Sequence, residues 1–199
     1  MSQQNNEKII VQEHAKGNKV ILFAGAHGKA NALDTLLDAG KMLVDSKVKV
    51  SVCLMGGGPE RERLRSRAED ERITNVIFLD AVNKNEVGNV LALADILYIG
   101  LAKTDLFRFG ISPNKMMDYM LAGKPIISAI DAGNDMVAEA DCGCSVPAED
   151  APAVAKAIKK LLALTEEERA RLGQNGKAYV MANHDYQKLA ADFIENLEA

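Results

Sequence analysis

The sequence predicts an α/β protein with a Rossmann-like, doubly wound sheet of six parallel strands, helices on both faces and a helical C-terminus. Short apolar runs rich in β-branched residues alternate with longer segments whose apolar residues recur at helical spacing. This alternation is typical of βαβ units. Six such runs separated by helical segments predict a parallel sheet that is covered on both faces.

The expected elements follow one another in a regular order. Strands are expected at residues 20–24, 48–55, 76–79, 96–99, 125–129 and 145–147. Helices are expected between them at residues 31–44, 60–72, 86–93, 114–121 and 136–140, and after them at 151–164, 166–182 and 186–197. Glycine at the end of the 114–121 helix and proline just beyond it mark where the next strand begins.

Domain boundaries are set by polarity at the N-terminus. Residues 1–17 are polar and are expected to form a flexible leader, and residues 18–199 to form one domain. The helix expected at 60–72 carries dense mixed charge, with only Leu64 and Ala68 as inward positions, so it should be largely exposed to solvent.

Composition excludes several classes of protein. The chain has 199 residues, 24 Lys and Arg against 28 Asp and Glu, and 48% hydrophobic residues. No apolar run reaches the ~18 residues of a membrane span, and the N-terminus does not resemble a signal peptide. Three cysteines, an odd number, indicate reduced thiols and a cytoplasmic location. A net charge of -4 argues against nucleic acid as a partner.

Glycine-rich loops follow the first two expected strands, where a parallel sheet binds its ligands. The first loop contains Gly25, His27, Gly28 and Lys29. It matches neither a dinucleotide-binding fingerprint nor a P-loop, because the glycine spacing differs and no Ser or Thr follows the lysine. The second loop contains three consecutive glycines, residues 56–58. Either loop alone is explained equally well as a tight turn.

The start of the 114–121 helix carries the richest chemistry. Ser112 or Asn114 can cap this helix, and a phosphate docked on its free amides would gain about 0.3–2 kcal/mol from the helix dipole. Lys115 would add a charge-assisted contact. Asp118 lies one turn later on the same face, where its carboxylate can accept hydrogen bonds from two ribose hydroxyls. The alternative is a capped helix with a Lys–Asp surface pair.

Other conspicuous residues have simpler interpretations. The His27 side chain either contacts a diphosphate or is merely solvated. Cys142 and Cys144 flank one glycine too closely for a zinc pair, so no metal site is expected. Met116 and its neighbouring methionines lie at helical spacing and are expected to pack in the core.

These motifs together resemble a known family. The resemblance covers about residues 18–197 and rests on Gly25 after the first strand, LDTLLDA at 33–39, GGGP at 56–59, NVIFLD at 75–80, AD at 94–95 and the block 112–125. In this order they resemble the C-terminal, donor-binding half of GT-B glycosyltransferases. The chain is most similar to the retaining glycosyl transferases group 1 family, especially bacterial polysaccharide enzymes.

The resemblance implies a site for a nucleotide diphosphate sugar, with UDP as the first carrier to consider. The pyrophosphate would be bound by Gly25, His27, Gly57, Gly58, Ser112, Asn114 and Lys115. Asp118 stands where the family has a glutamate that holds the ribose, and the backbone at Ala81 and Val82 would meet the base. His27 and Lys29 represent the family's cationic pair, with Asn31 nearest the expected lysine.

Family chemistry also implies partners and a mechanism. Lys115 and Lys29 would assist departure of the diphosphate without a metal or other cofactor. An acceptor-binding domain would be supplied in cis or in trans, and membrane-surface association would come through it. Without that domain, catalysis is expected to be absent or weak. Two alternatives remain: a non-catalytic interaction module on the same scaffold, and half of a sugar-nucleotide epimerase.

Overall fold

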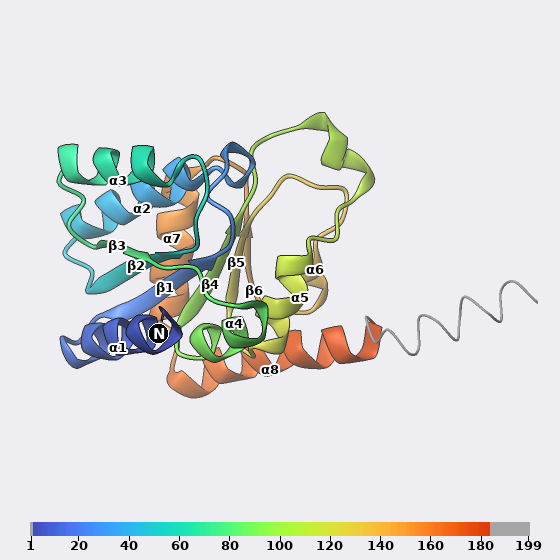
Figure 1. The fold of residues 1–199 in the computed structure, drawn as a ribbon. Coiled ribbons are helices and arrows are strands. Elements are labelled where there is room, and N and C mark those ends of the chain that lie inside the picture. Colours follow the sequence, from blue (N-terminus) through green and yellow to red (C-terminus); the bar gives the residue numbers. More distant parts are fainter. Residues whose placement is uncertain (1, 184–199) are drawn as a thin grey trace, which may run out of the picture.

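The protein is a three-layered α/β domain (Figure 1). The computed structural model describes residues 2–183. The six strands are β1 (Lys19–Ala24), β2 (Val50–Met55), β3 (Val76–Leu79), β4 (Ile96–Gly100), β5 (Ile126–Ala129) and β6 (Gly143–Val146). They pair in parallel in the order β3-β2-β1-β4-β5-β6. This order confirms the predicted doubly wound sheet and places its switch point between β1 and β4.

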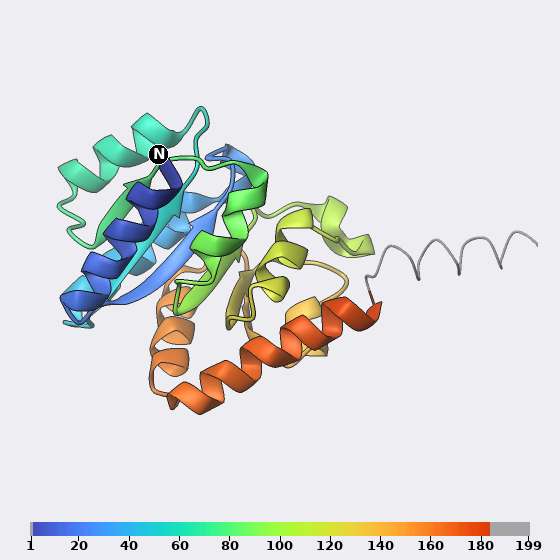
Figure 2. The same ribbon diagram turned by 60° about the horizontal axis from the view of Figure 1, so that its bottom comes forward.

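Helices cover both faces of this sheet, as Figures 1 and 2 show. The helices are α1 (Ser2–Ala15), α2 (Leu33–Asp45), α3 (Arg61–Asp70), α4 (Lys84–Leu91), α5 (Asn114–Leu121), α6 (Met136–Glu139), α7 (Ala151–Leu162) and α8 (Glu166–Asn183). The core beneath α2, α3 and α7 is separate from the core beneath α1, α4, α5, α6 and α8. Within residues 2–183, no helix combines the length and apolarity needed to cross a bilayer.

Strand β1 shows how the sequence supplies both cores. Ile21 and Phe23 face the α2 side, whereas Val20, Leu22 and Ala24 face the α5 side. Successive strand residues point to opposite faces, so a strand buried on both sides is apolar throughout. Every expected strand is present, with boundaries that differ by no more than two residues.

The predicted helices are also present wherever the structure describes the chain. The helix predicted at 114–121 has those boundaries. The helix predicted from residue 31 begins instead at Leu33, because Lys29–Asn31 form a 3-10 turn and Ala32 has a left-handed backbone with φ of 45°. The helix expected at 186–197 lies outside the described residues.

The prediction of a flexible segment over residues 1–17 is wrong. Residues Ser2–Ala15 form helix α1, and its Ile10 side chain is fully buried in the core on the α5 side. The helix packs through only a few positions, so its mean polarity concealed it. Asn6 is also buried, and its Nδ2 donates to the carbonyl oxygen of Asp80 at 2.8 Å.

Glu13 attaches the end of α1 to the sheet. Its carboxylate accepts hydrogen bonds from Ser51 Oγ at 2.6 Å, Asn18 Nδ2 at 2.9 Å and Lys16 Nζ at 2.6 Å. Although burial opposes ionisation, these hydrogen bonds lower the pKa of Glu13 to about 2. A polar helix can therefore be held in place where buried polar groups such as Glu13 find partners in the sheet.

Candidate functional site

The two glycine-rich loops are joined by direct backbone contact. Gly25 N–H donates to the carbonyl oxygen of Met55 at 2.9 Å. Gly56 has φ of +137°, and a Cβ atom there would lie 2.0 Å from the carbonyl oxygen of Gly25. Gly58 has φ of +146°, and its Cβ would lie 2.6 Å from the carbonyl oxygen of His27. Only glycine allows so close an approach, so the two loops form one rim at the carboxyl edge of the sheet.

A cavity of about 360 Å³, here called the loop cavity, opens beside this rim. Parts of three βα connections and of helices α4 and α5 line it, namely Ala24, Gly25, Ala26, Met55, Gly56, Gly57, Ala81, Val82, Val87, Lys115 and Asp118. The structure thus brings together six of the residues expected from the sequence. They are Gly25, Gly57, Ala81, Val82, Lys115 and Asp118.

Backbone amides at the cavity are available to a ligand. No carbonyl or side-chain oxygen in residues 2–183 accepts a hydrogen bond from the N–H of Ala26 or Gly57. A Cβ atom on Gly57 would have nothing within 4 Å, so this glycine faces open space. Free backbone amides on loops that meet at one cavity can bind anionic oxygens.

Lys115 brings a partly desolvated charge to the same place. Its Nζ donates to Asn31 Oδ1 at 2.9 Å and lies 4.1 Å from the centre of the Phe23 ring. A Cβ atom at Gly25 would lie 2.7 Å from this Nζ, so the glycine makes room for the lysine. Burial lowers the pKa of Lys115 to about 8. At neutral pH the ammonium is still largely protonated, and an anion would replace part of its lost solvation.

The start of α5 differs from the prediction in its cap. Pro113 is the N-cap residue, and no side chain caps the helix, so the prediction that Ser112 or Asn114 caps it is wrong. Both of those side chains are exposed, and neither lines the loop cavity. The helix is held instead by Tyr119, whose buried hydroxyl accepts from Ala24 N–H at 2.7 Å and donates to Ala24 O at 3.3 Å.

Asp118 lies at the edge of the loop cavity, one helical turn after Lys115. Its side chain is exposed, and it forms no hydrogen bond or ion pair with any residue that the structure describes. The carboxylate is therefore free to accept hydrogen bonds from a ligand. The alternative of a Lys–Asp surface pair is not observed, because Lys115 donates to Asn31.

His27 cannot contact a phosphate in this conformation, which corrects the prediction for its side chain. The side chain is fully buried, with ring centroids 6.0 Å from Phe23 and 6.2 Å from Phe78. Burial, together with the charges of Arg61 and Lys115, lowers its pKa to about 4, so the imidazole is neutral. The backbone is also engaged, because His27 N–H donates to Gly57 O at 2.7 Å and His27 O accepts from Glu60 N–H at 2.9 Å.

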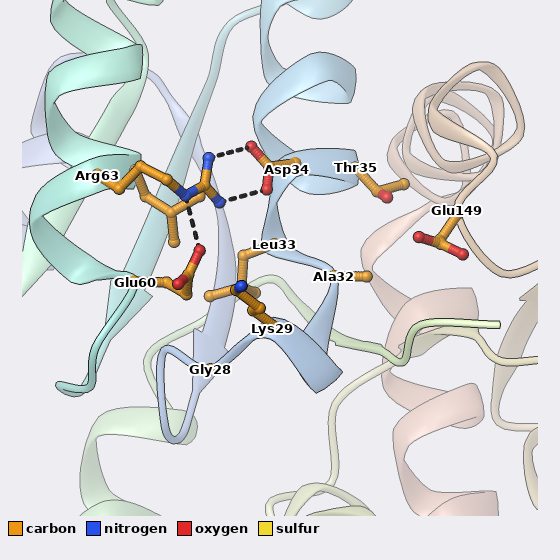
Figure 3. Close-up of a pocket in the computed structure, with 10 residues that line it drawn as sticks. Gly28, Lys29, Ala32, Leu33, Asp34, Thr35, Glu60, Arg63 and Glu149 are labelled. Atoms are coloured by element: carbon orange, nitrogen blue, oxygen red, sulfur yellow. Dashed lines mark hydrogen bonds and ion pairs between the residues drawn. The ribbon is translucent and has the colours of Figure 1, made fainter. Parts of the chain in front are cut away.

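Lys29 lines a different hollow from Lys115, which corrects the expectation that both lysines assist the same diphosphate (Figure 3). This α2–α3 cavity, of about 500 Å³, is lined by Gly28, Lys29, Ala32, Leu33, Asp34, Thr35, Glu60, Arg63, Leu64 and Glu149. Here Arg63 donates to both carboxylate oxygens of Asp34, at 3.0 and 2.5 Å, and to Glu60 at 2.7 Å. Gly58 likewise does not line the loop cavity, since it packs on the His27 backbone.

Two residues support the loops in roles that the sequence did not assign to them. Arg61 donates to the carbonyl oxygens of Gly56 and Leu79, the latter at 2.8 Å, and so fixes the second glycine loop to the end of β3. Asn31 donates from Nδ2 to Ala26 O at 2.9 Å. The arginine was counted among the solvent-facing charges of its helix, although its position just after three glycines is a usable signal.

The remaining titratable groups offer little further chemistry. Burial raises the pKa of the Cys53 and Cys142 thiols to about 12, so neither is a ready nucleophile. Over residues 2–183, no group of three or more His, Cys, Asp or Glu side chains is arranged to hold a metal ion.

Several solved structures share this fold. HepE from Anabaena, in complex with UDP and glucose, superposes with a TM-score of 0.75 at 18% identity over 100% of this chain and 53% of HepE. Sucrose-phosphate synthase from Thermosynechococcus elongatus superposes with a TM-score of 0.74 at 21% identity. The match covers 94% of this chain and 48% of the synthase. This chain therefore spans about half the length of these proteins.

A solved C-terminal domain is of similar size to this chain. It belongs to LpcC, a glycosyl transferase group 1 family protein from Francisella tularensis, and superposes with a TM-score of 0.68 at 15% identity. The match covers 88% of this chain and 92% of that domain. No curated protein sequence gives a significant match. The model of the family described as glycosyl transferases group 1 matches residues 4–179, and the chain therefore belongs to this family.

Proposed function

We propose that this chain is the donor-binding domain of a retaining glycosyltransferase, and that it holds a nucleotide diphosphate sugar in the loop cavity. The observation that supports this proposal most strongly is that unpaired loop amides, Lys115 and Asp118 all line one cavity at the carboxyl edge of the sheet. Family membership sets the class of reaction. UDP is the first nucleotide to test, because the related fold of HepE was solved with UDP and with UDP-glucose.

In this proposal the diphosphate lies between Lys115 and the amides of Ala26 and Gly57. Negative charge grows on the diphosphate as the bond to the sugar breaks. An ammonium held in a partly desolvated place stabilises that charge in the transition state, because it needs little reorganisation. The protein's own groups thus supply the electrostatic assistance, and the proposal requires no metal.

The nucleoside would extend from the diphosphate along the cavity. Asp118 accepts hydrogen bonds from the ribose hydroxyls, each contributing about 1.5–3 kcal/mol as a bond to a charged group. Ala81 and Val82 also line the cavity, and in this proposal their backbone meets the edge of the base. Asp118 is one methylene shorter than the family's glutamate, so the ribose would lie closer to α5.

The acceptor-binding part is proposed to come from a second domain, in cis or in trans. The match to an isolated C-terminal domain over nearly its full length supports this assignment, as does the half-length match to larger proteins. Transfer requires both substrates to be held in register, so this domain alone should bind nucleotide but turn over poorly. In keeping with its reduced thiols, we place it in the cytoplasm.

Calorimetric titration with UDP, GDP and uridine tests the proposal. UDP or GDP should bind with millimolar or tighter affinity, whereas uridine, which lacks the diphosphate, should bind at least about tenfold more weakly. Lys115→Ala should weaken UDP by about tenfold, the loss of one hydrogen bond to a charged group. Lys156→Ala, which removes an exposed lysine on α7, is the matched control and should change nothing. Absence of binding by both nucleotides would refute the assignment.

A further inference from the structure

We propose that Asn31 is a positioning residue, which fixes the Lys115 ammonium at the loop cavity and ties it to the first glycine loop. The inference rests on the proposed function of that cavity, and it identifies a residue through which the lysine is presented. Asn31 does not itself line the loop cavity, so it would act through Lys115.

The geometry that points to this role is a two-sided contact by one amide. Asn31 is the last residue of the 3-10 turn before α2 and is half-buried. Its Oδ1 accepts from Lys115 Nζ at 2.9 Å, and its Nδ2 donates to Ala26 O at 2.9 Å. One side chain therefore links α5, 84 residues away along the chain, to the loop that offers the free Ala26 amide.

Lys115 needs such a partner because its other contact is not directional. The Phe23 ring lies 4.1 Å from Nζ and attracts the cation, but a ring face lets an ammonium slide. A lysine side chain also has four rotatable bonds. Gly25 leaves an open space where Nζ lies, since a Cβ there would be only 2.7 Å away. Of these neighbours, Asn31 alone defines a direction through a hydrogen bond.

The neutrality of Asn31 suits a lysine that must bind an anion. An ammonium has three N–H donors, and one bond to Asn31 leaves two for phosphate oxygens. A carboxylate at position 31 would hold the lysine equally well but would neutralise its charge. Two other ionisable groups lie near Lys115, the neutral His27 and Asp118, and neither forms a hydrogen bond with its Nζ.

A double-mutant cycle on UDP affinity tests whether Asn31 acts through Lys115. Asn31→Ala should weaken UDP by about tenfold in the otherwise unchanged protein. In a Lys115→Ala background the same change should cost less than about twofold, because the group it positions has gone. Equal losses in both backgrounds would overturn the proposal. Asn89→Ala, an exposed position on α4, is the control and should have no effect in either background.

A ligand-free measurement separates failure of this proposal from failure of the proposed function. NMR titration of the Lys115 side chain should give a pKa that is lower in Asn31→Ala than in the unchanged protein and higher in Asn31→Asp. Asn31→Asp keeps the size of the side chain and an oxygen that can accept from Lys115 Nζ. It therefore tests the proposal even if the alanine variant fails to fold. It should nonetheless bind UDP more weakly. An unchanged Lys115 pKa across the series would refute the positioning role, whether or not UDP binds.

Discussion

The loop cavity and the α2–α3 cavity are lined by different residues of the β1–α2 connection, and they differ in how their charged side chains are partnered. In the smaller loop cavity, Asp118 has no partner among the described residues, and Lys115 contacts two uncharged groups, the Asn31 amide and the Phe23 ring. In the larger cavity, Arg63 is engaged by Asp34 and Glu60, as Figure 3 shows. Volume alone would favour the second. Lys29 lines the larger cavity with no ion-pair partner in residues 2–183, but it is exposed to solvent, whereas Lys115 is half-buried without a carboxylate partner. The charge that a ligand would compensate therefore favours the first cavity.

The largest expected effect comes from a substitution that disturbs the backbone of the loop cavity. Gly56→Ala should destabilise the protein by about 2 kcal/mol or more and abolish UDP binding, because Cβ would lie 2.0 Å from Gly25 O at a left-handed φ. Urea unfolding and calorimetry measure the two losses.

Gly57→Ala is the matched control for that change. A Cβ atom there would have nothing within 4 Å, so the free energy of unfolding should change by less than about 0.5–1 kcal/mol. Equal destabilisation by the two substitutions would show that the loops do not pack as described.

A second prediction concerns the pH dependence of UDP binding at the loop cavity. UDP affinity should fall as pH rises from about 7 to about 9, since Lys115, with a pKa lowered to about 8 by burial, loses its charge in that range. The bound anion favours the protonated form of Lys115. The pKa of Lys115 in the complex should therefore lie above its pKa in the free protein. Calorimetry across this range measures it, and Lys115→Ala should bind weakly with a flat profile.

A third prediction concerns the α2–α3 cavity, where charge should matter to stability alone. Hydrogen bonds from Arg63 and then Arg67 hold the pKa of Asp34 below its usual value. A lowered carboxyl pKa contributes stability above the unfolded-state value of about 3.9, and that contribution is lost as pH falls through the folded-state value.

The same ion pairs set the size of the expected effect. Asp34→Asn should reduce the free energy of unfolding at neutral pH by about 1 kcal/mol or less, since the pair is partly exposed and screened by solvent. Urea unfolding at neutral and acidic pH measures this difference, which should shrink in acid. UDP affinity should be unchanged, and a marked loss would mean that the two cavities are coupled.

Sequence reasoning was most successful where a signal is local and periodic. Apolar alternation identified β3 and α5 with their observed boundaries, because helix and strand faces repeat within one element. The positions of Gly25, Gly57, Lys115 and Asp118 in one cavity followed from the rule that parallel strands present their ligand-binding loops at one edge.

The failures share a different cause, which is contact between loops that are far apart in sequence. The orientation of the His27 side chain depends on contacts with residues later in the chain. Gly58 packs against the His27 backbone, Glu60 N–H donates to its carbonyl oxygen, and the Phe78 ring packs against its imidazole. Helix α1 was missed because its packing depends on a few buried positions, such as Ile10, rather than on a periodic apolar face. Neither feature leaves a periodic mark within its own segment.

The smallest expected effect separates these two cavities most directly. Lys29→Ala should change UDP affinity by less than about twofold, whereas Lys115→Ala should change it by about tenfold. Both lysines follow strands at the same edge of the sheet, and the family resemblance implied that both assist departure of the diphosphate. The structure puts Lys29 in the α2–α3 cavity and Lys115 in the loop cavity. Equal losses in calorimetry would require the first loop to turn over when nucleotide binds, which the hydrogen bond from Asn31 to Ala26 O opposes.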